Sequence, residues 1–284
     1  MIERVVPLHR LPPGYEKALR NPPDPPVKPR PAATLALLRK APSGLEVLLL
    51  KRTPRARFIP GACVFPGGRV DPADGSGEMA ALRSGHAGAG ADPHTPDAAS
   101  DQVTASDQVA AAHQVAALRE TLEETGILVG GGPAGEGTWN LSSHGREDSI
   151  LPALRSGALT FAQALERLGR PALPPSLPLI GHWVTPVQER HRYDTLFFGI
   201  QVPADCRAVP DGSELVEGIW LTPEEALDRN RAGGLPMVFP TLDTLEALSA
   251  FSDPAEALTA LSQREIPRLL PEVEETGDGI RMVV

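Results

Sequence analysis

Runs of apolar residues separated by turn residues mark the strands that this chain is expected to form. Residues 33–40 and 45–52 are two such runs, and the Ala41-Pro42-Ser43-Gly44 segment between them predicts a β-hairpin. Further strands are predicted at 179–187, 195–202 and 216–221, and helices at 109–125, 161–168, 223–231 and 242–250. The helix at 223–231 has the clearest beginning, because Thr222 suits the capping position and Pro223 the first turn.

Two segments lack the patterns of apolar residues that predict strands and helices. Residues 21–32 are rich in proline and are predicted to form an extended lead-in rather than a helix or a central strand. Residues 75–107 are rich in Gly, Ala, Ser and Asp and contain little that could build a core, which predicts a flexible insert. The insert closes with Ala-Ser-Asp-Gln-Val at 99–103 and again at 105–109, and a later copy of this repeat is expected to extend the following helix.

The helix predicted at 109–125 carries an acidic strip near its end. At about 100° per residue, Glu120, Glu123 and Glu124 fall within roughly 100° of one another around the helix axis. The apolar residues on the far side are Ala111, Val115, Leu118 and Leu122. We therefore expect the apolar stripe to be buried and the acidic strip to face outward.

The charges of this strip are not balanced within the helix. Glu120 and Glu124 repel each other across one turn, at a cost of about 0.2–0.5 kcal/mol. Gly126 is expected to end the helix just beyond them, where acids oppose the helix dipole. Between residues 101 and 130 the only Lys or Arg is Arg119. A solvated helix face is the alternative interpretation, but a divalent cation, which prefers carboxylate oxygens, would relieve the repulsion.

Composition and charge narrow the classes of function. With 284 residues, 41% of them hydrophobic, the chain can bury one sizeable core. A formal net charge of -9 argues against a nucleic acid or an anionic membrane as partner, and no apolar stretch approaches the roughly 20 residues that span a bilayer. Only Cys63 and Cys206 are present, which argues against a disulfide framework or a zinc site and favours the reducing cytoplasm.

A second motif precedes the insert. It runs Val64-Phe65-Pro66-Gly67-Gly68-Arg69-Val70-Asp71-Pro72-Ala73-Asp74, and the helix contributes Arg119-Glu120-Thr121-Leu122-Glu123-Glu124-Thr125-Gly126-Ile127. Together they resemble the Nudix box, which runs Gly, five residues, Glu, seven residues, then Arg-Glu-U-any-Glu-Glu-any-Gly-U, where U is aliphatic. Three departures are visible. Thr121 replaces an aliphatic residue, Asp74 replaces the first glutamate with a side chain one methylene shorter, and the insert separates Asp74 from Arg119.

The resemblance to the Nudix hydrolases implies an α+β fold, an αβα sandwich whose mixed β-sheet lies between helices. It implies metal-dependent hydrolysis of a diphosphate linkage in a nucleoside diphosphate derivative, with Mg²⁺ or Mn²⁺ as cofactor and a small-molecule nucleotide as substrate. The split box, the preceding Phe-Pro-Gly-Gly, and the segments 48–52 and 192–198 resemble the branch that includes coenzyme A and acyl-coenzyme A diphosphatases. Pyrophosphatase activity on ADP-ribose, NADH or dinucleoside polyphosphates is the alternative.

By this resemblance, Glu120, Glu123 and Glu124 are the expected metal ligands, and Gly67 adds a backbone carbonyl because glycine lets the chain approach an ion closely. The three glutamates and Arg119 form the expected catalytic set, with Glu120 also a candidate for the general base. Arg119 either orients a glutamate or only pairs with Glu123 one turn away.

Outside the box the sequence offers further candidates. A carboxylate from a distant loop could act as the base, and the acids available are Glu189, Asp211, Glu214 and Glu217. The candidates for binding substrate or phosphate are Gly68, Arg52, Arg55, Arg57, Arg190 and Arg192. A solvated turn is the alternative for the last two. The aromatic residues expected in strands or the core, rather than in a surface that stacks on a base, are Tyr193, Phe197, Phe198, Trp183 and Trp220.

The expected organisation is an N-terminal extension over 1–32 and a single domain over 33–284, with the insert at 75–107. A helical C-terminal extension over 235–284 either caps the site or packs beside it. Members of the family often dimerise, so a homodimer is one expectation. Two other classes of function stay open: a Nudix-derived regulator that binds nucleotide without hydrolysing it, and a scaffold whose glutamates are merely solvated.

Overall fold

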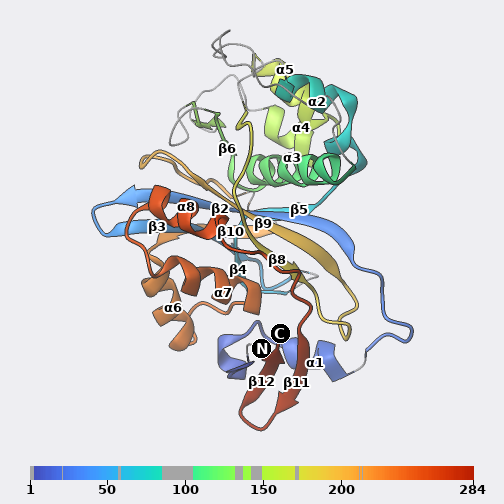
Figure 1. Cartoon of the computed structure of the whole chain (residues 1–284), viewed down its shortest axis with the longest axis vertical. Helices are drawn as coiled ribbons and strands as arrows, with labels where there is room; N and C mark the ends of the chain where they lie inside the picture. Colours follow the sequence, from blue (N-terminus) through green and yellow to red (C-terminus); the bar gives the residue numbers. More distant parts are fainter. Residues whose placement is uncertain are drawn as a thin grey trace.

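A mixed β-sheet forms the middle layer of the fold (Figure 1). The computed structural model describes residues 3–20, 22–56, 59–84, 105–131, 137–141, 149–169, 173–210, 212 and 214–284. In order across the sheet, the main strands in this part of the chain are β10 (Leu215–Leu221), β3 (Gly44–Arg52), β2 (Arg30–Ala41), β9 (Tyr193–Gln201) and β8 (Leu179–Val184). β2 and β9 run parallel, whereas the other neighbours are antiparallel. The predicted hairpin and the other predicted strands are therefore present.

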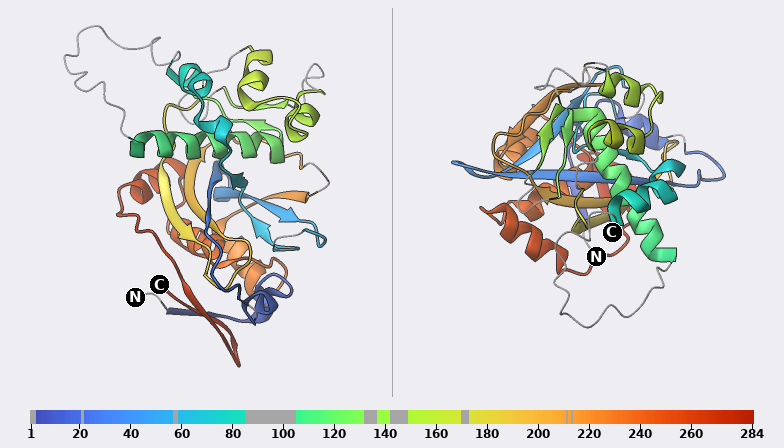
Figure 2. Two further views of the ribbon diagram at one scale, coloured as in Figure 1. Left: turned by 90° about the vertical axis from the view of Figure 1, so that its right-hand side faces the viewer. Right: turned by 90° about the horizontal axis from the view of Figure 1, so that it is seen from above.

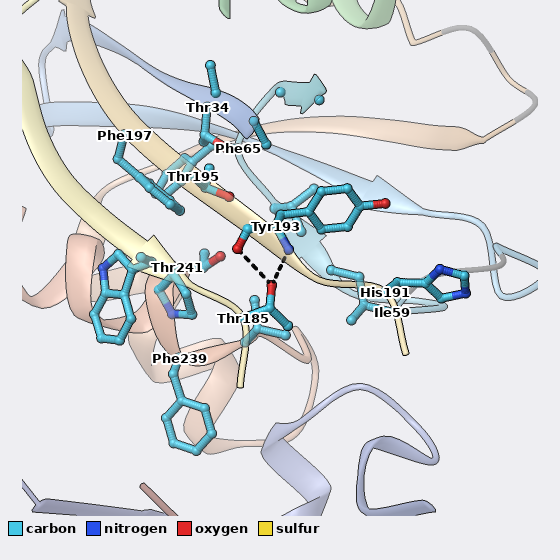
Figure 3. A pocket seen from close by; sticks show the side chains of 18 of the residues that line it. Thr34, Ile59, Phe65, Thr185, His191, Tyr193, Thr195, Phe197, Phe239 and Thr241 are labelled. Atoms are coloured by element: carbon cyan, nitrogen blue, oxygen red, sulfur yellow. Dashed lines mark hydrogen bonds between the residues drawn. The ribbon is translucent and has the colours of Figure 1, made fainter. Parts of the chain in front are cut away.

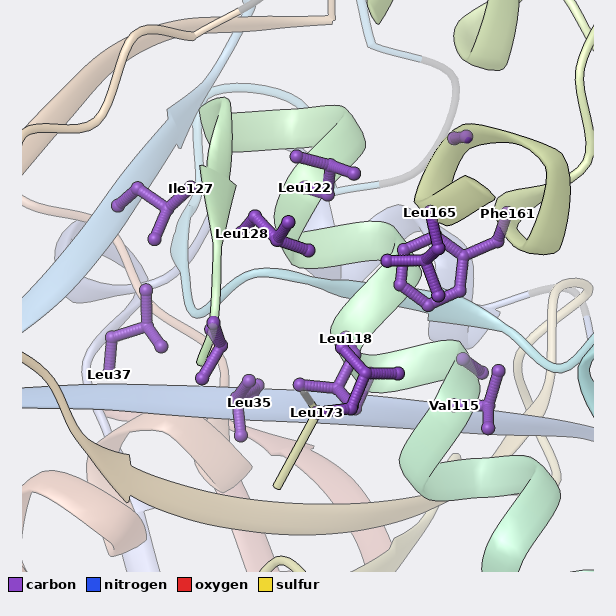
Figure 4. Close-up of a cluster of buried hydrophobic side chains, with 14 of the residues drawn as sticks. Leu35, Leu37, Val115, Leu118, Leu122, Ile127, Leu128, Phe161, Leu165 and Leu173 are labelled. Carbon is purple, nitrogen blue, oxygen red and sulfur yellow. The ribbon is translucent and has the colours of Figure 1, made fainter. Parts of the chain in front are cut away.

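Helices cover both faces of this sheet. One face packs against α3 (Ala105–Thr125), α4 (Ile150–Arg155) and α5 (Phe161–Arg167) through a cluster of buried aliphatic and aromatic side chains (Figure 4). The other face packs against α6 (Pro223–Arg231), α7 (Phe239–Leu248) and α8 (Pro254–Ser262). Residues 47–50 of β3 are all fully buried, because a strand covered on both faces has no polar side. The expected αβα sandwich is confirmed.

β2 and β3 separate beyond their hairpin, and each then pairs with a short strand. Their own pairing extends from Ala41 and Gly44 at the turn to Leu38 and Val47. The first part of β2 pairs instead with β5 (Gly67–Arg69), and the end of β3 pairs with β4 (Cys63–Val64). The glycine segment of the box is therefore held in the sheet itself, by backbone hydrogen bonds.

The predicted insert requires a correction at its beginning. The 3₁₀ helix η2 (Pro72–Gly75) ends at the first residue of the predicted insert, and helix α2 (Gly77–Ser84) occupies residues that composition had assigned to a flexible segment. Met79 of α2 is only 2% exposed and belongs to the cluster beneath α3, and Leu82 packs against the same cluster, so two apolar side chains anchor this helix. The extension of α3 is as predicted, since the helix begins at Ala105 in the second copy of the repeat. Residues 85–104 lie outside the described residues.

The two ends of the chain pack together rather than forming separate extensions. β1 (Glu3–Val6) pairs with β12 (Gly279–Val283), and β12 pairs with β11 (Glu272–Thr276) (Figures 1 and 2). This terminal sheet packs against α1 (Tyr15–Arg20). The helical prediction for 235–284 is right for α7 and α8 but wrong for the last strands. There a two-residue turn at Gly277-Asp278 closes a hairpin whose apolar residues face the core.

The lead-in predicted for 21–32 also ends earlier than expected. β2 begins at Arg30, and Pro31 lies opposite Asp194 of β9. Proline is tolerated at the start of a strand, where its missing N–H interrupts little of the ladder. In the described part of the chain, no helix is both long and apolar enough to cross a membrane. Cys63 and Cys206 are free and buried, and burial raises the pKa of each thiol to about 11.

Candidate active site

Helix α3 presses its acidic strip against the glycine strand β5. The strip does not face outward as expected, because Gly68 leaves room for it. A Cβ atom on Gly68 would lie 2.4 Å from the carboxylate of Glu120. Gly67 permits a second close approach, since its Cβ would lie 2.5 Å from the carbonyl oxygen of Ala33 in β2. One glycine therefore brings β5 to the sheet, and the other brings a glutamate to β5.

Arg119 joins the two halves of the split box. Its Nε and Nη2 atoms donate to the two carboxylate oxygens of Asp74 at 2.9 and 3.0 Å, and both side chains are buried. Its Nη1 atom donates to Glu120 at 2.9 Å and to Glu123 at 3.2 Å. Nη2 also donates to the carbonyl oxygen of Arg69 at 2.9 Å. Arg119 therefore orients two glutamates, and the sequence had left open whether it did so.

Asp74 reaches Arg119 despite its shorter side chain. The 3₁₀ helix η2 packs directly against α3, and this close packing compensates for the missing methylene. One carboxylate oxygen of Asp74 also accepts a hydrogen bond from the backbone N–H of Asp71 at 2.8 Å, which fixes its direction. The shorter side chain therefore still makes both hydrogen bonds to Arg119.

The departure at Thr121 is also explained by its surroundings. Thr121 is fully buried, and its hydroxyl donates to the carbonyl oxygen of Ala117 at 2.7 Å, so its polar atom is satisfied within the helix. The helix ends where predicted: Gly126 has φ +69°, a conformation that glycine adopts without strain. Arg155 of α4 donates to the carbonyl oxygen of Glu123 at 2.6 Å, which places positive charge at the helix end.

Glu124 and Glu120 are buried carboxylates of like charge. Glu124 accepts a hydrogen bond from the backbone N–H of Gly67 at 2.9 Å. Burial holds the pKa of Glu124 well above its usual value, and the charge of Glu120 raises it further. Burial also raises the pKa of Glu120 to about 7, although Arg119 opposes this shift. Both groups would be stabilised in their charged form by a nearby cation.

A cavity of about 640 Å³ opens beside these carboxylates. Figure 3 shows Thr34 and Phe65 at one end, Tyr193, Thr195 and Phe197 along β9, and Phe239 at the other end. The wall between β8 and β9 is fixed by Thr185. Its hydroxyl donates to the carbonyl oxygen of Tyr193 at 3.3 Å and accepts from the backbone N–H of Tyr193 at 3.0 Å (Figure 3).

Several residues proposed from the sequence meet at this cavity. Of the residues expected to bind metal or substrate, those that line it are Gly67, Gly68, Arg52, Glu120 and Glu124. Glu123 does not line it, because its carboxylate turns toward Arg119. Within the described residues, no three His, Cys, Asp or Glu side chains are grouped closely enough to hold a metal ion. The two glutamates that do face the cavity supply carboxylate oxygens, the donors that a hard divalent cation prefers.

The arginines after β8 do not reach the cavity, contrary to expectation. Arg190 is exposed and does not line the cavity. Arg55, which follows β3, is also exposed and does not line it. Arg192 is buried, and its guanidinium donates to the carbonyl oxygens of Thr185 and Val27 at 3.0 and 2.7 Å. Arg192 therefore ties the lead-in segment to the loop, and it does not line the cavity. Arg57 lies outside the described residues.

The four acids proposed as the base are separated by the fold. Glu189 and Glu214 line the cavity, Glu217 does not, and Asp211 lies outside the described residues. Glu214 accepts a hydrogen bond from Arg52 and lies close enough to Glu124 to influence its pKa. Glu189 is only 6% exposed, and burial raises its pKa to about 7.

The aromatic residues divide in a way the sequence did not indicate. Phe198 is in the core as expected, but Tyr193, Phe197 and Trp183 line the cavity as well as contributing to strands. Trp220 is partly buried beneath the guanidinium of Arg39, whose Cζ atom lies 4.3 Å from the ring centroid. The cavity residues missed from the sequence include Tyr15, Thr34, Phe239 and Thr241. No motif distinguished them from ordinary core residues.

A mixed sheet between two helical layers defines a Nudix hydrolase when a glycine strand meets, at one cavity, helix glutamates that a buried arginine holds in place. The comparisons with known proteins agree. The family model of the NUDT19 Nudix domain matches residues 27–248, and the chain belongs to the Nudix family.

Named relatives support the same assignment. The acyl-coenzyme A diphosphatase NUDT19 of Gallus gallus is 31% identical over 276 residues, covering 85% of this chain and 73% of that protein. The Homo sapiens protein of the same name is 27% identical over 281 residues, covering 90% of this chain and 72% of its own. A crystal structure of a Nudix hydrolase from Alicyclobacillus acidocaldarius is 32% identical, with a TM-score of 0.63, covering 84% of this chain and 99% of that one.

Proposed function

We propose that this enzyme hydrolyses the diphosphate linkage of coenzyme A or an acyl-coenzyme A, and that the reaction requires Mg²⁺ or Mn²⁺. Two of the relatives above are named acyl-coenzyme A diphosphatases. The observation that carries the proposal is the division of one cavity into two ends. Glu120 and Glu124 lie at the charged end, and Trp183 and Phe239 lie at the aromatic end. The described Lys and Arg residues that line it are Arg52 and Arg69, and both lie at the end of the cavity that holds Glu120 and Glu124. A diphosphate with a long uncharged arm matches this division.

The glutamates would hold the cation. Glu120 and Glu124 face the cavity, Glu123 lies one turn away, and the backbone carbonyl of Gly67 is the further ligand that we propose. When bound, the ion neutralises the phosphate oxygens and lowers the pKa of a bound water. Arg119 keeps Glu120 and Glu123 in position through its hydrogen bonds.

The protein groups at this end have separate tasks. Arg52 is the cavity arginine whose guanidinium is suited to bind a phosphate oxygen, and its partner Glu214 holds it in place. Glu120 and Glu214 are the two carboxylates that could accept the proton of the attacking water, because both lie near Glu124.

A substrate panel tests this function. The full-length protein would be incubated with Mg²⁺ or Mn²⁺ and with coenzyme A, acyl-coenzyme A, ADP-ribose, NADH, diadenosine polyphosphates and nucleoside triphosphates. We expect cleavage of coenzyme A species into two monophosphate products, identified by mass, and loss of turnover in EDTA that either metal restores. Strong activity in EDTA would refute the metal requirement. Turnover of ADP-ribose or NADH without coenzyme A cleavage would refute the substrate.

A further inference from the structure

The aromatic end of the cavity, which we define by Tyr15, Trp183, Glu189, Phe239 and Pro271, is distinct from the glutamate end. Phe239 lies opposite Thr34 in Figure 3, and Thr34 pairs with Gly67 of the box. Tyr15 and Pro271 come from outside the region that the family model matches, residues 27–248. Segments beyond the Nudix domain therefore help to close this end.

The terminal segments are fixed firmly enough to form a wall. Tyr15 of α1 packs edge-to-face on Phe239 of α7, with ring centroids 6.5 Å apart. α1 is joined to β11 by an ion pair between Arg20 and Glu275 at 2.6 Å. Tyr15 is 9% exposed and Phe239 2%, so both rings are held by packing.

The segment that leads to Pro271 is bonded to the main sheet. The backbone N–H of Leu269 donates to the carbonyl oxygen of His182 at 2.9 Å, and that of Val184 donates to the carbonyl oxygen of Leu269 at 2.8 Å. Arg268 adds hydrogen bonds to Asp194 at 2.8 and 3.0 Å. Pro271 is thereby placed at the cavity by a continuation of the sheet edge.

Charge decides what this end can accept. Glu189 is buried in its wall, and among the described residues no Lys or Arg pairs with it. The adenosine half of coenzyme A carries a further phosphate, which a buried carboxylate would repel and which would meet no Lys or Arg among the described residues of this end. The other half is an uncharged arm with amide N–H groups, a hydroxyl and, in thioesters, an acyl chain. A carboxylate accepts hydrogen bonds from such amides, and the aromatic side chains suit the acyl chain.

We propose that the aromatic end binds the uncharged, acylated arm of the substrate and selects acyl-coenzyme A over free coenzyme A. This inference rests on the proposed function. Glu189 accepts a hydrogen bond from the arm, and Trp183, Phe239 and Tyr15 contact the acyl chain. Burying one methylene contributes about 0.8 kcal/mol, or about fourfold in affinity. The specificity constant kcat/KM should therefore rise with chain length until this end is filled.

A variant that fills the aromatic end tests the proposal. Val238 lines the cavity, is half-buried and has an extended backbone (φ -90°, ψ 161°) that phenylalanine also adopts. The values of kcat/KM would be measured for coenzyme A and for its acetyl, hexanoyl, octanoyl and lauroyl thioesters. With Val238→Phe we expect at least a tenfold loss for the lauroyl thioester relative to coenzyme A, and a preference for shorter chains. Val209→Phe is the matched control, since Val209 is 46% exposed and outside the cavity.

A second variant removes an aromatic contact rather than adding one. Phe239→Leu should lower the ratio of octanoyl to free coenzyme A hydrolysis, and calorimetric dissociation constants in EDTA should show the same change without catalysis. If the wild type cleaves coenzyme A species but both variants keep its chain-length profile, the acyl site is wrong and the proposed function stands. If the wild type cleaves no coenzyme A species, the proposed function fails and this inference fails with it.

Discussion

Replacing Asp74 with asparagine tests the bond that joins the two halves of the split box. Asp74→Asn keeps the size of the side chain but removes its charge and turns one acceptor into a donor that faces Arg119. In the native protein the pair makes two hydrogen bonds, at 2.9 and 3.0 Å, between side chains that are 1% and 9% exposed. The change therefore leaves a buried guanidinium partly unpaired.

The expected loss follows from this burial. Removing one partner of a buried ion pair costs about 3–5 kcal/mol. Arg119 keeps Glu120, Glu123 and the carbonyl oxygen of Arg69, so we expect a loss near the lower limit, about 3 kcal/mol in the free energy of unfolding. For a domain of this size, each kcal/mol lowers Tm by about 2–4 °C, so Tm should fall by about 6–12 °C.

Thermal and urea unfolding in EDTA would measure this loss without a contribution from bound metal. Asp71→Asn is the matched control, because its carboxylate lies 3.8 Å from Arg119 and its side chain is 53% exposed. An exposed pair contributes about 0–1 kcal/mol, so the control should unfold almost as the wild type does. If the free energy of unfolding of Asp74→Asn also stayed within about 1 kcal/mol of the wild-type value, Arg119 would not depend on Asp74. The proposed link between the two halves of the split box would then be wrong.

Three further predictions follow from the site. Glu124→Gln should lower kcat at least about hundredfold with saturating Mg²⁺, and comparable turnover in this variant and in Glu217→Gln, whose side chain lies outside the cavity, would contradict the proposed ligand set. Gly68→Ala places a methyl 2.4 Å from a glutamate carboxylate, whereas the same change at Gly77 meets nothing within 4 Å, so only the first should reduce kcat, by about tenfold or more. Burial raises the pKa of Glu189 to about 7, so the folded protein holds this proton between about pH 4.5 and 7 and loses stability as pH rises through that window. Relative to the wild type, Glu189→Gln should therefore gain about 2–3 kcal/mol between pH 5 and pH 8, measured by unfolding in EDTA, and a constant difference would exclude a raised pKa.

Local patterns in the sequence predicted much of the fold. The hairpin follows from two apolar runs and turn residues, and β2 and β3 pair through Ala41 and Gly44. The end of α3 follows from Gly126, because only the last residues of a helix and its cap are needed to recognise it. The terminal strands were missed because their hairpin is completed by β1, more than 270 residues away in the chain.

Some residues of the site could likewise be predicted from the sequence, and others could not. Gly68, Glu120 and Glu124 could be found from the sequence, because the two motifs that carry them have a fixed spacing within each half. Glu189 and Glu217 were equivalent candidates there, and only the fold placed the first in the cavity and the second outside it. Charge and residue type were the same for both, so no local signal could have separated them.

The sequence by itself determined the chemistry of the glutamate end, because a helix sets the positions of residues three and four apart without help from the rest of the chain. Tertiary structure alone decided the other end of the cavity. Tyr15 and Phe239 belong to a buried core cluster and also line the cavity, and this place depends on contacts between the two termini and the sheet. Such contacts join residues distant in sequence, and they depend on the packing of the whole domain rather than on any local pattern.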